Sequence, residues 1–294
     1  MSSKEIATAF AEVRRGFPFP GYMDSKLSRY VAIASQIMER VRPGSTILSI
    51  GSGPCDLEAI LSKLGYSVTG VDDLRDQWHL MGKNRERIKH FAKMMNVELV
   101  IESAGSSPLQ KNHFNAVLLI DIIEHLHTSP RELLNYAISC LKSGGVLLIE
   151  TPNSVALSKR LKVLLGKTNH VDIEFFYWTI GEYRSHVREY TRAELRQILL
   201  HHNLIEIGSK VTNSQTKLIQ TERLSGKVTI KIYELICTLS PNFRDTILIW
   251  GTKPKNWLPT NYSINAWEKH YPLMPRYNLD NESDEVLVNK LLQQ

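Results

Sequence analysis

Cysteine is scarce in this sequence of 294 residues, which contains only Cys55, Cys140 and Cys237. The three are odd in number and far apart, so they form neither a disulfide framework nor a pair with the spacing of a metal site. Such usage is typical of proteins that are kept in a reducing compartment. We therefore expect a cytoplasmic protein without structural disulfides.

Long hydrophobic runs are also missing. No stretch approaches the roughly 20 apolar residues that a membrane-spanning helix requires. The N-terminal residues MSSKEIATAFAEVRRGF lack the apolar core of a signal peptide and have the spacing of an amphipathic helix. The sequence contains no internal repeat and no low-complexity segment, and we expect a globular chain with no transmembrane segment.

The charge is only mildly unbalanced, with a formal net charge of +6. Basic residues gather at 83–89, 159–162 and 184–196, which solvated helix faces explain. The alternative is contact with an acidic substrate, a nucleic acid or an anionic membrane surface. No aromatic-interleaved RNA motif accompanies the charge, so the sequence favours a small-molecule ligand over a nucleic acid. The basic residues would allow that small molecule to be anionic.

What the sequence does contain is a strand, a glycine turn, a helix and a second strand within 45–73, STILSIGSGPCDLEAILSKLGYSVTGVDD. Gly51 and Gly53 let a ligand approach the backbone closely. Asp72 closes the second strand 21 residues beyond Gly51, the spacing at which a carboxylate reaches ribose hydroxyls. Asp56 replaces a glycine of the dinucleotide fingerprint, and an acid there repels a pyrophosphate. The pattern predicts a site for a nucleoside without phosphates, with a purely structural turn as the alternative.

Residues 45–73 resemble motif I of the class I S-adenosylmethionine-dependent methyltransferases, hydrophobic-D-x-G-x-G-x-G. Gly51 and Gly53 match its first two glycines, and Asp72 matches the ribose-binding acid. Ser49 and Cys55 depart from it, because the family usually has an acid and a third glycine there. The later segment LKSGGVLLIETPN is also similar to the family, so the resemblance runs from about 45 to 153. It extends to the ubiquinone-type and methyltransferase-domain 23 small-molecule O-methyltransferases.

This resemblance implies an α/β fold, a Rossmann-like seven-stranded and mostly parallel sheet with helices on both faces and an antiparallel last strand. Residues 1–44 would form N-terminal helices that act as a lid. Residues 45–253 would be the methyltransferase domain, with an acceptor-recognition insert at 154–192. Residues 254–294 would be a C-terminal appendage.

The cofactor that the resemblance implies is S-adenosylmethionine. Open parallel sheets bind their ligands at the carboxyl ends of the strands, and the expected contacts follow the first four strands. Ser103 stands where family members often carry an acid that contacts adenine. The expected cofactor-binding residues are Gly51, Ser52, Gly53, Asp72, Asp73, Ser103, Ala104 and Asp121.

The fourth predicted strand ends in Asp121-Ile122-Ile123-Glu124-His125. Methyl transfer to a hydroxyl requires removal of a proton, and we assign His125, His186 and Glu124 to catalysis, with a histidine as general base. Ubiquinone-pathway O-methyltransferases and small-RNA 2′-O-methyltransferases use a similar E-x-x-E-H and a later histidine as metal ligands. Their similarity implies a divalent cation on Asp121, Glu124, His125 and His186, a role that we rank below the base. In the third interpretation Glu-His only caps the following helix.

The sequence thus predicts a methyltransferase that acts on a small acceptor. The pattern GSGPCDLEAIL, followed by VDDL and a tryptophan, is similar to methyltransferases of cell-surface glycan pathways. We therefore expect the acceptor to be a hydroxyl of a sugar or related metabolite, a class that includes glycan-linked compounds. Alternatives are methylation of RNA or of a quinone-like lipid, and a non-catalytic protein that only binds S-adenosylmethionine. The residues expected to hold a ring and an anionic group of the acceptor are Tyr177, Trp178, Arg184 and Arg188.

Overall fold

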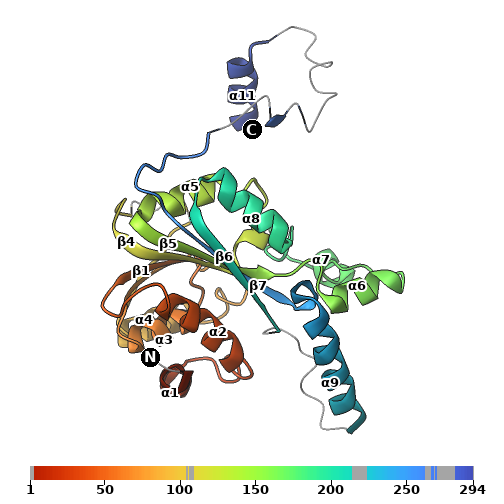
Figure 1. Cartoon of the computed structure of the whole chain (residues 1–294). Coiled ribbons are helices and arrows are strands. Elements are labelled where there is room, and N and C mark those ends of the chain that lie inside the picture. The colour runs from red at the N-terminus through yellow and green to blue at the C-terminus, as the bar shows by residue number, and fades with distance from the viewer. Residues whose placement is uncertain are drawn as a thin grey trace. The chain divides into compact units, whose positions relative to one another are not determined.

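A seven-stranded sheet forms the centre of the computed structural model, with the strand order β3-β2-β1-β4-β5-β7-β6 (Figure 1). The structure describes residues 3–103, 105, 109–213, 224–261, 266–267, 269 and 282–293. Strand β7 is antiparallel to both β5 and β6, and the remaining pairs are parallel. The predicted α/β fold is therefore confirmed. The strands are β1 Thr46–Ile50, β2 Ser67–Val71, β3 Val97–Val100, β4 Phe114–Ile120, β5 Leu141–Pro152, β6 Ile205–Thr212 and β7 Thr246–Thr252.

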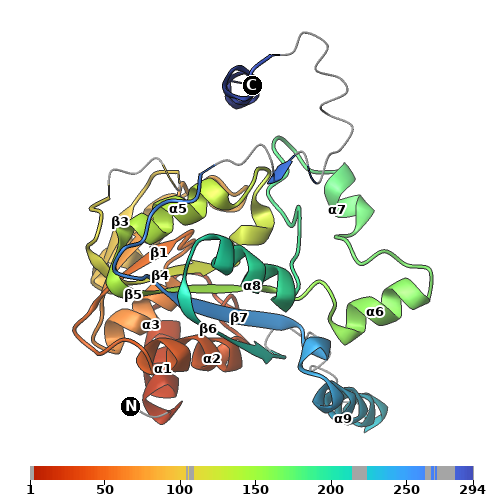
Figure 2. The same ribbon diagram turned by 45° about the horizontal axis from the view of Figure 1, so that its top comes forward.

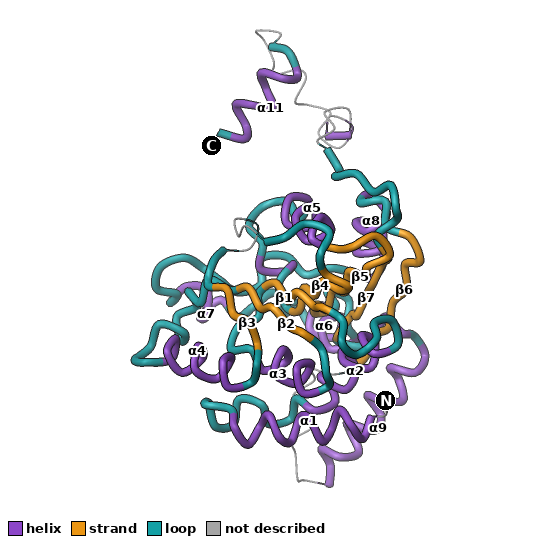
Figure 3. The backbone as a smooth tube through the Cα atoms, turned by 90° about the vertical axis from the view of Figure 1, so that its left-hand side faces the viewer, coloured by secondary structure: helices purple, strands orange, loops and turns teal. Residues whose placement is uncertain are grey.

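Helices cover both faces of this sheet (Figure 3). One face carries α1 Ser3–Gly16, α2 Leu27–Met38, α3 Asp56–Lys63 and α4 Asn84–Met94, and the other carries α5 Arg131–Cys140 and α8 Arg192–His201. The central strands read as nearly continuous apolar runs because both faces are buried. Side chains alternate between the two cores: Ile47 packs with the first group of helices, and Leu48 and Ile50 pack with the second.

Local signals account for several element ends. The side chain of Thr191 accepts a hydrogen bond from the Glu194 N–H, and the Glu194 carboxylate accepts one from the Thr191 N–H, so α8 begins with a capping box. Strand β6 extends to Thr212, although its apolar residues are concentrated near its start, at Ile205 and Ile207. It is an edge strand with half-exposed, partly polar residues, so the apolar run stops before the strand does.

The insert after β5 contains two short helices, α6 Leu157–Leu164 and α7 Ile173–Tyr177. Helix α9, Leu224–Leu239, lies between β6 and β7 in the chain (Figure 2). Tyr233 and Cys237 of α9 pack against Leu157 of α6. None of the helices in the described ranges is long and apolar enough to cross a membrane.

The chain divides into two compact units, residues 1–258 and 259–294. The first unit extends past the predicted domain end at 253 because Trp257 donates a hydrogen bond from Nε1 to the His202 carbonyl at 2.8 Å. The second unit contains α11, Asp284–Leu292. The lid role of residues 1–44 and the recognition role of 154–192 stay predictions.

Candidate active site

Two adjoining cavities lie at the carboxyl ends of the parallel strands, where open α/β sheets bind ligands. The larger has a volume of about 480 Å³ and the smaller of about 230 Å³. Gly51, Asp72, Asp121, Ile122 and His125 line both cavities. The predicted glycine turn, ribose acid and fourth-strand acid therefore meet at one place with the candidate base.

The turn after β1 shows why glycine is needed at two positions of the motif, 51 and 53. Gly51 has a φ of +73°, and a Cβ there would lie 1.8 Å from Cδ1 of Ile122. Gly53 has a φ of +52°, and a Cβ there would have no described heavy atom within 4 Å, so a ligand has room to approach. Cys55 occupies the usual place of the third glycine and keeps a left-handed φ of 63° as the N-cap of α3. Position 55 therefore keeps the left-handed backbone conformation that favours glycine, although a buried cysteine occupies it.

Asp72 ties the end of β2 to the glycine turn. Its carboxylate accepts hydrogen bonds from the N–H of Gly53 at 2.8 Å and of Leu74 at 2.7 Å. Burial raises the pKa of the Asp72 carboxyl, and these two hydrogen bonds offset part of the increase. Ser52 is buried beside the smaller cavity, and Ser103 lines the larger one. Ala104 lies outside the described residues.

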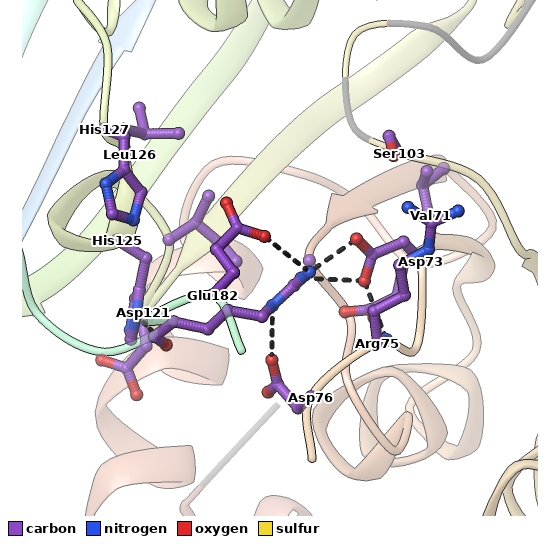
Figure 4. A pocket seen from close by; sticks show the side chains of 14 residues that line it. Val71, Asp73, Arg75, Asp76, Ser103, Asp121, His125, Leu126, His127 and Glu182 are labelled. Atoms are coloured by element: carbon purple, nitrogen blue, oxygen red, sulfur yellow. Dashed lines mark hydrogen bonds and ion pairs between the residues drawn. The ribbon is translucent and has the colours of Figure 1, made fainter. Parts of the chain in front are cut away.

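Arg184 joins the insert to the loop that follows β2. Its guanidinium contacts both carboxylate oxygens of Asp73, at 2.9 and 3.0 Å, and Asp76 at 3.0 Å. Figure 4 shows Asp73, Asp76 and Glu182 around this guanidinium, on one wall of the larger cavity. The sequence assigned Asp73 to the cofactor and Arg184 to the acceptor, and the structure pairs them with each other.

The same part of the insert is also held by the segment after β4. The ring nitrogen Nδ1 of His125 lies 3.0 Å from the Arg184 carbonyl oxygen, and Nε2 of His127 lies 2.9 Å from the Tyr183 carbonyl oxygen. On the other side, Gln77 donates to the Ile180 carbonyl at 2.7 Å. Residues 180–184 therefore bridge the loops after β2 and β4.

The hydrogen bond of His125 determines which ring nitrogen is free. A carbonyl oxygen only accepts, so Nδ1 carries the proton and Nε2 of the neutral ring is unprotonated. Burial lowers the pKa of His125, and nearby His186 lowers it further. His125 is therefore neutral at pH 7 and able to accept a proton.

His186 lies beside His125, with ring centroids 5.0 Å apart. Its Nδ1 is 2.9 Å from a Glu189 carboxylate oxygen, to which it donates a hydrogen bond. His186 lines a separate cavity of about 130 Å³, so His125 is the closer of the two to the glycine turn.

Glu124 is fully buried in the short turn Ile123–His125. Its carboxylate accepts a hydrogen bond from the Thr151 hydroxyl at 2.9 Å, and its carbonyl accepts the N–H groups of Val187 and Arg188. Burial, followed by nearby Asp121, raises the pKa of the Glu124 carboxyl. Glu124 thus holds the insert against the β4 end, a contact that the capping interpretation did not include.

Three of the four residues weighed as metal ligands come together. One ligand atom from each of Glu124, His125 and His186 lies within 4.8 Å of the others. Asp121 is engaged elsewhere: its carboxylate pairs with the Arg29 guanidinium at 2.5 Å. The trio offers one oxygen and two imidazole donors, which suit a transition-metal ion better than Mg²⁺.

Sequence reasoning missed a polar wall of the smaller cavity. It comprises Lys26, Arg29 and Tyr30 at the start of α2, and Asp56 and Glu58 in the first turn of α3. The Tyr30 hydroxyl donates to the Asp56 carboxylate. Positions 26, 29 and 30 have i, i+3, i+4 spacing, so their common helix face was the available signal.

The buried acids predict how stability depends on pH. Burial raises the pKa of Glu58 to about 8 and that of Glu150 to about 7, whereas an unfolded glutamate titrates near ~4.3. Above about pH 6.5 the folded protein holds more protons than the unfolded chain, so we expect the unfolding free energy to fall between about pH 6.5 and 8. His125, whose pKa is lowered, adds stability as pH rises only up to about 6.5, the unfolded value.

Urea unfolding across this interval measures the effect. The Glu58→Gln variant is the control, because it removes one of the protons and should show a shallower fall. Stability that rises between pH 6.5 and 8 would contradict the assignment of buried, protonated carboxyls.

Comparisons with known proteins agree with this geometry. The family model described as Methyltransferase domain matches residues 20–205, more than half of the chain. A ubiquinone biosynthesis O-methyltransferase of Paramagnetospirillum magneticum is 30% identical over 122 residues, which are 41% of this chain and 46% of that protein. The ubiquinone/menaquinone biosynthesis C-methyltransferase UbiE of Pseudomonas fluorescens is 28% identical over 157 residues, 50% of this chain and 60% of that protein. The matches thus span about half of these relatives' lengths.

A solved structure supports the fold. The SAM dependent methyltransferase from Archaeoglobus fulgidus superimposes with a TM-score of 0.52 at 18% identity, over 78% of this chain and 95% of that one. The strand order with β7 antiparallel, the glycine turn at Gly51 and the acid at Asp72 are the features that the resemblance implied. The chain belongs to the methyltransferase-domain family of class I S-adenosylmethionine-dependent methyltransferases.

Proposed function

We propose that the protein transfers the methyl group of S-adenosylmethionine to a hydroxyl of a small acceptor. One observation carries this proposal. His125 lines both cavities beside the glycine turn, and its neutral ring has an unprotonated Nε2. Hydroxyl acceptors need a base of this kind, because the proton has to leave as the new bond forms.

The residues around the cavities fit the cofactor. Gly53 leaves open space next to the backbone, and Asp72 lies directly beside it. Glu58 has a buried carboxylate oxygen without a hydrogen-bond partner in the described ranges, which suits a ligand with a cationic group. Gly51, Ser52, Gly53, Asp72 and Ser103 would hold the cofactor. When bound, it supplies an electrophilic methyl group on a positively charged sulfur.

The chain's own residues would orient the acceptor, exclude water and take its proton. His125 would accept the proton at Nε2, while the Arg184 carbonyl holds its ring through Nδ1. The bridge at residues 180–184 would close the cavity toward solvent, which strengthens the electrostatic interactions inside it. Glu124 would position this segment rather than react, because its carbonyl binds the backbone of the insert.

A hydroxyl of a sugar or related metabolite is the acceptor class that the sequence favours, and it remains our first candidate. The second candidate is the phenolic hydroxyl of a quinone-like lipid. It is supported by the relative named as a ubiquinone biosynthesis O-methyltransferase and by large apolar side chains that the insert exposes. These include Leu164, Leu165, Phe175, Phe176, Tyr177 and Trp178.

An acceptor panel tests the proposal. The purified protein is incubated with S-adenosylmethionine labelled in the methyl group and with sugars, nucleotide-linked sugars, catechols, short-chain prenylated phenols and RNA. We expect label to enter a hydroxyl compound. The rate should fall in acid, at a pH below the ordinary histidine pKa, because burial lowers the pKa of His125 and protonation removes its acceptor lone pair. Transfer to RNA alone would replace the small-molecule proposal, and cofactor binding without transfer to any compound would favour a non-catalytic binding protein.

A further inference from the structure

We infer that Glu58 binds the α-ammonium group of the cofactor's methionine arm, and that it supplies the carboxylate that this chain lacks at Ser49. The inference rests on the proposed function, because it assigns one contact to the proposed cofactor. The contact lies in the smaller cavity, and the residues of its polar wall are not among the positions of the glycine motif described above.

The position of Glu58 follows from helix α3. Leu57, Ile60 and Leu61 of this helix pack into the core, and Glu58 in the first turn lines the smaller cavity together with Gly51 and Gly53. The N-terminal turn of a helix favours a carboxylate, because the backbone N–H groups point toward it. The sequence thus places an acid directly beside the glycine turn from the helix rather than from the strand.

Glu58 also lies next to the position of the missing acid. The Ser49 side chain lies close enough to the Glu58 carboxyl to lower the pKa of that group, against the larger effect of burial. Both side chains are almost fully buried, with exposed fractions of 1% and 2%. The carboxyl of Glu58 in α3 therefore lies beside residue 49, the position at which the family usually has an acid.

One oxygen of this carboxyl group lacks a hydrogen-bond partner. Oε2 of Glu58 is buried and has no hydrogen-bond partner among the side chains and backbone that the structure describes. A buried carboxylate needs either a proton or a cation, since an unpaired buried charge costs several kcal/mol. Burial raises the pKa of Glu58 to about 8, so without a cation the group keeps its proton at neutral pH.

The protein's own cations near this cavity are directed elsewhere. The Arg29 guanidinium pairs with Asp121 and Glu150, and the Lys26 ammonium lies over the Tyr22 ring, 3.4 Å from its centroid. Acidic groups dominate the remaining wall: Asp56, Asp72, Asp76 and Asp121 line the cavity with Glu58. An acidic cavity with an open carboxylate oxygen fits a cationic ligand group of about the size of an ammonium.

Calorimetry with two ligands isolates this contact. S-adenosylhomocysteine carries the α-ammonium, whereas 5′-methylthioadenosine has the same nucleoside and sulfur without the amino-acid group. We expect Glu58→Gln to weaken S-adenosylhomocysteine at least tenfold, about 1.4 kcal/mol, and to change 5′-methylthioadenosine less than twofold. Glu86→Gln is the matched control, since Glu86 is an exposed acid in the first turn of α4, and it should change neither affinity.

A proton balance gives a second readout that does not depend on the variant's affinity. The ammonium would replace a proton on Glu58, so binding of S-adenosylhomocysteine to the wild type at pH 7 should release most of one proton. The difference between the heats of binding in phosphate and in Tris buffer measures this proton release. The other titratable groups that line this cavity are Asp56, Asp72, Asp76, Asp121, Tyr22, Lys26, Arg29, Tyr30, His79 and His125. They are unchanged in Glu58→Gln, so proton release that disappears in this variant belongs to Glu58.

The outcomes separate this inference from the proposed function. If the wild type binds S-adenosylhomocysteine and folded Glu58→Gln binds it equally well, the assignment of Glu58 is overturned while the proposed function stands. If the wild type binds neither ligand, the cofactor proposal fails and the assignment fails with it. Equal weakening of both ligands would show a general effect on the cavity and would also overturn the ammonium contact.

Discussion

Replacement of His125 by alanine is expected to lower kcat by about 10²- to 10⁴-fold, the usual contribution of a positioned general base. The dissociation constant of the cofactor should change only a few-fold, because the glycine turn and Asp72 remain. The physical reason is the loss of Nε2, the free lone pair of a neutral ring that the Arg184 carbonyl orients. Single-turnover kinetics and calorimetry measure the two effects separately.

His127→Ala is the matched control for this experiment. His127 also holds the insert, through the Tyr183 carbonyl at 2.9 Å, but it is not the proposed base. We expect its loss to change kcat by less than about tenfold, the range left for a supporting contact. If His127→Ala is as impaired as His125→Ala, the insert contact rather than proton transfer explains the loss.

The same system distinguishes a base from a metal site. We expect His186→Ala to lose turnover in both cases, because its ring stands beside His125 and within reach of the same ligand position. With a base alone, a chelator leaves the wild-type rate unchanged. A chelated protein that loses activity and regains it with one divalent ion would instead support metal binding by Glu124, His125 and His186.

Replacement of Arg29 by methionine is expected to lower the unfolding free energy by about 3–5 kcal/mol at pH 7, the usual cost of removing one partner of a buried ion pair. The Arg29 side chain is 13% exposed and contacts Asp121 and Glu150, each at 2.5 Å. Without it, a fully buried Glu150 faces Asp121 and loses the guanidinium that neutralises both carboxylates. Urea unfolding of the variant and the wild type measures the difference.

An exposed ion pair of similar length provides the control. Arg14 contacts Asp24 at 2.5 Å with both side chains more than half exposed, so Arg14→Met should cost at most about 1 kcal/mol. The double variant Arg29→Met/Glu150→Gln should recover part of the lost stability, because it removes one of the stranded carboxylates. Equal costs for Arg29→Met and Arg14→Met would show that the buried group contributes no more than a surface pair.

The structure also changes how the insert is understood. The sequence assigned Tyr177, Trp178, Arg184 and Arg188 to the acceptor. Arg184 instead pairs with Asp73 and Asp76, and Arg188 pairs with Glu194 at 2.9 Å. Tyr177 and Trp178 are about 70% exposed, so they are the members of this set that remain accessible to a ligand or another molecule.

Elements with strong local signals were predictable from the sequence. The apolar run of β1, the left-handed turn at Gly51 and the capping box at Thr191 each depend on residues within a few positions of one another. Asp72 was predictable for a related reason, since a strand–helix–strand unit fixes how far its second strand ends from the first. The order of the strands and the antiparallel β7 followed from the family resemblance rather than from such signals.

The contacts that make the site specific join residues that are distant in the sequence. Arg29 reaches Glu150 across 121 positions, and His125 reaches the Arg184 carbonyl across 59. No local pattern records such a pair, because each partner alone reads as an ordinary polar residue on a helix or in a loop.

Glu58 shows most clearly the difference between what the sequence determines locally and what only the folded structure decides. By itself the sequence determined the strand, glycine turn and helix within 45–73 and the acid at Asp72, because chain periodicity and turn chemistry act over short distances. The α/β fold class followed from the family resemblance. The meeting of His125 with His186 was also implied by that resemblance. Only the tertiary structure decided that Glu58 faces the cavity beside Ser49 and that Arg29 neutralises the acids at the ends of β4 and β5. Those outcomes depend on which side chains the closed sheet and its helices bury together, and burial is a property of the whole fold.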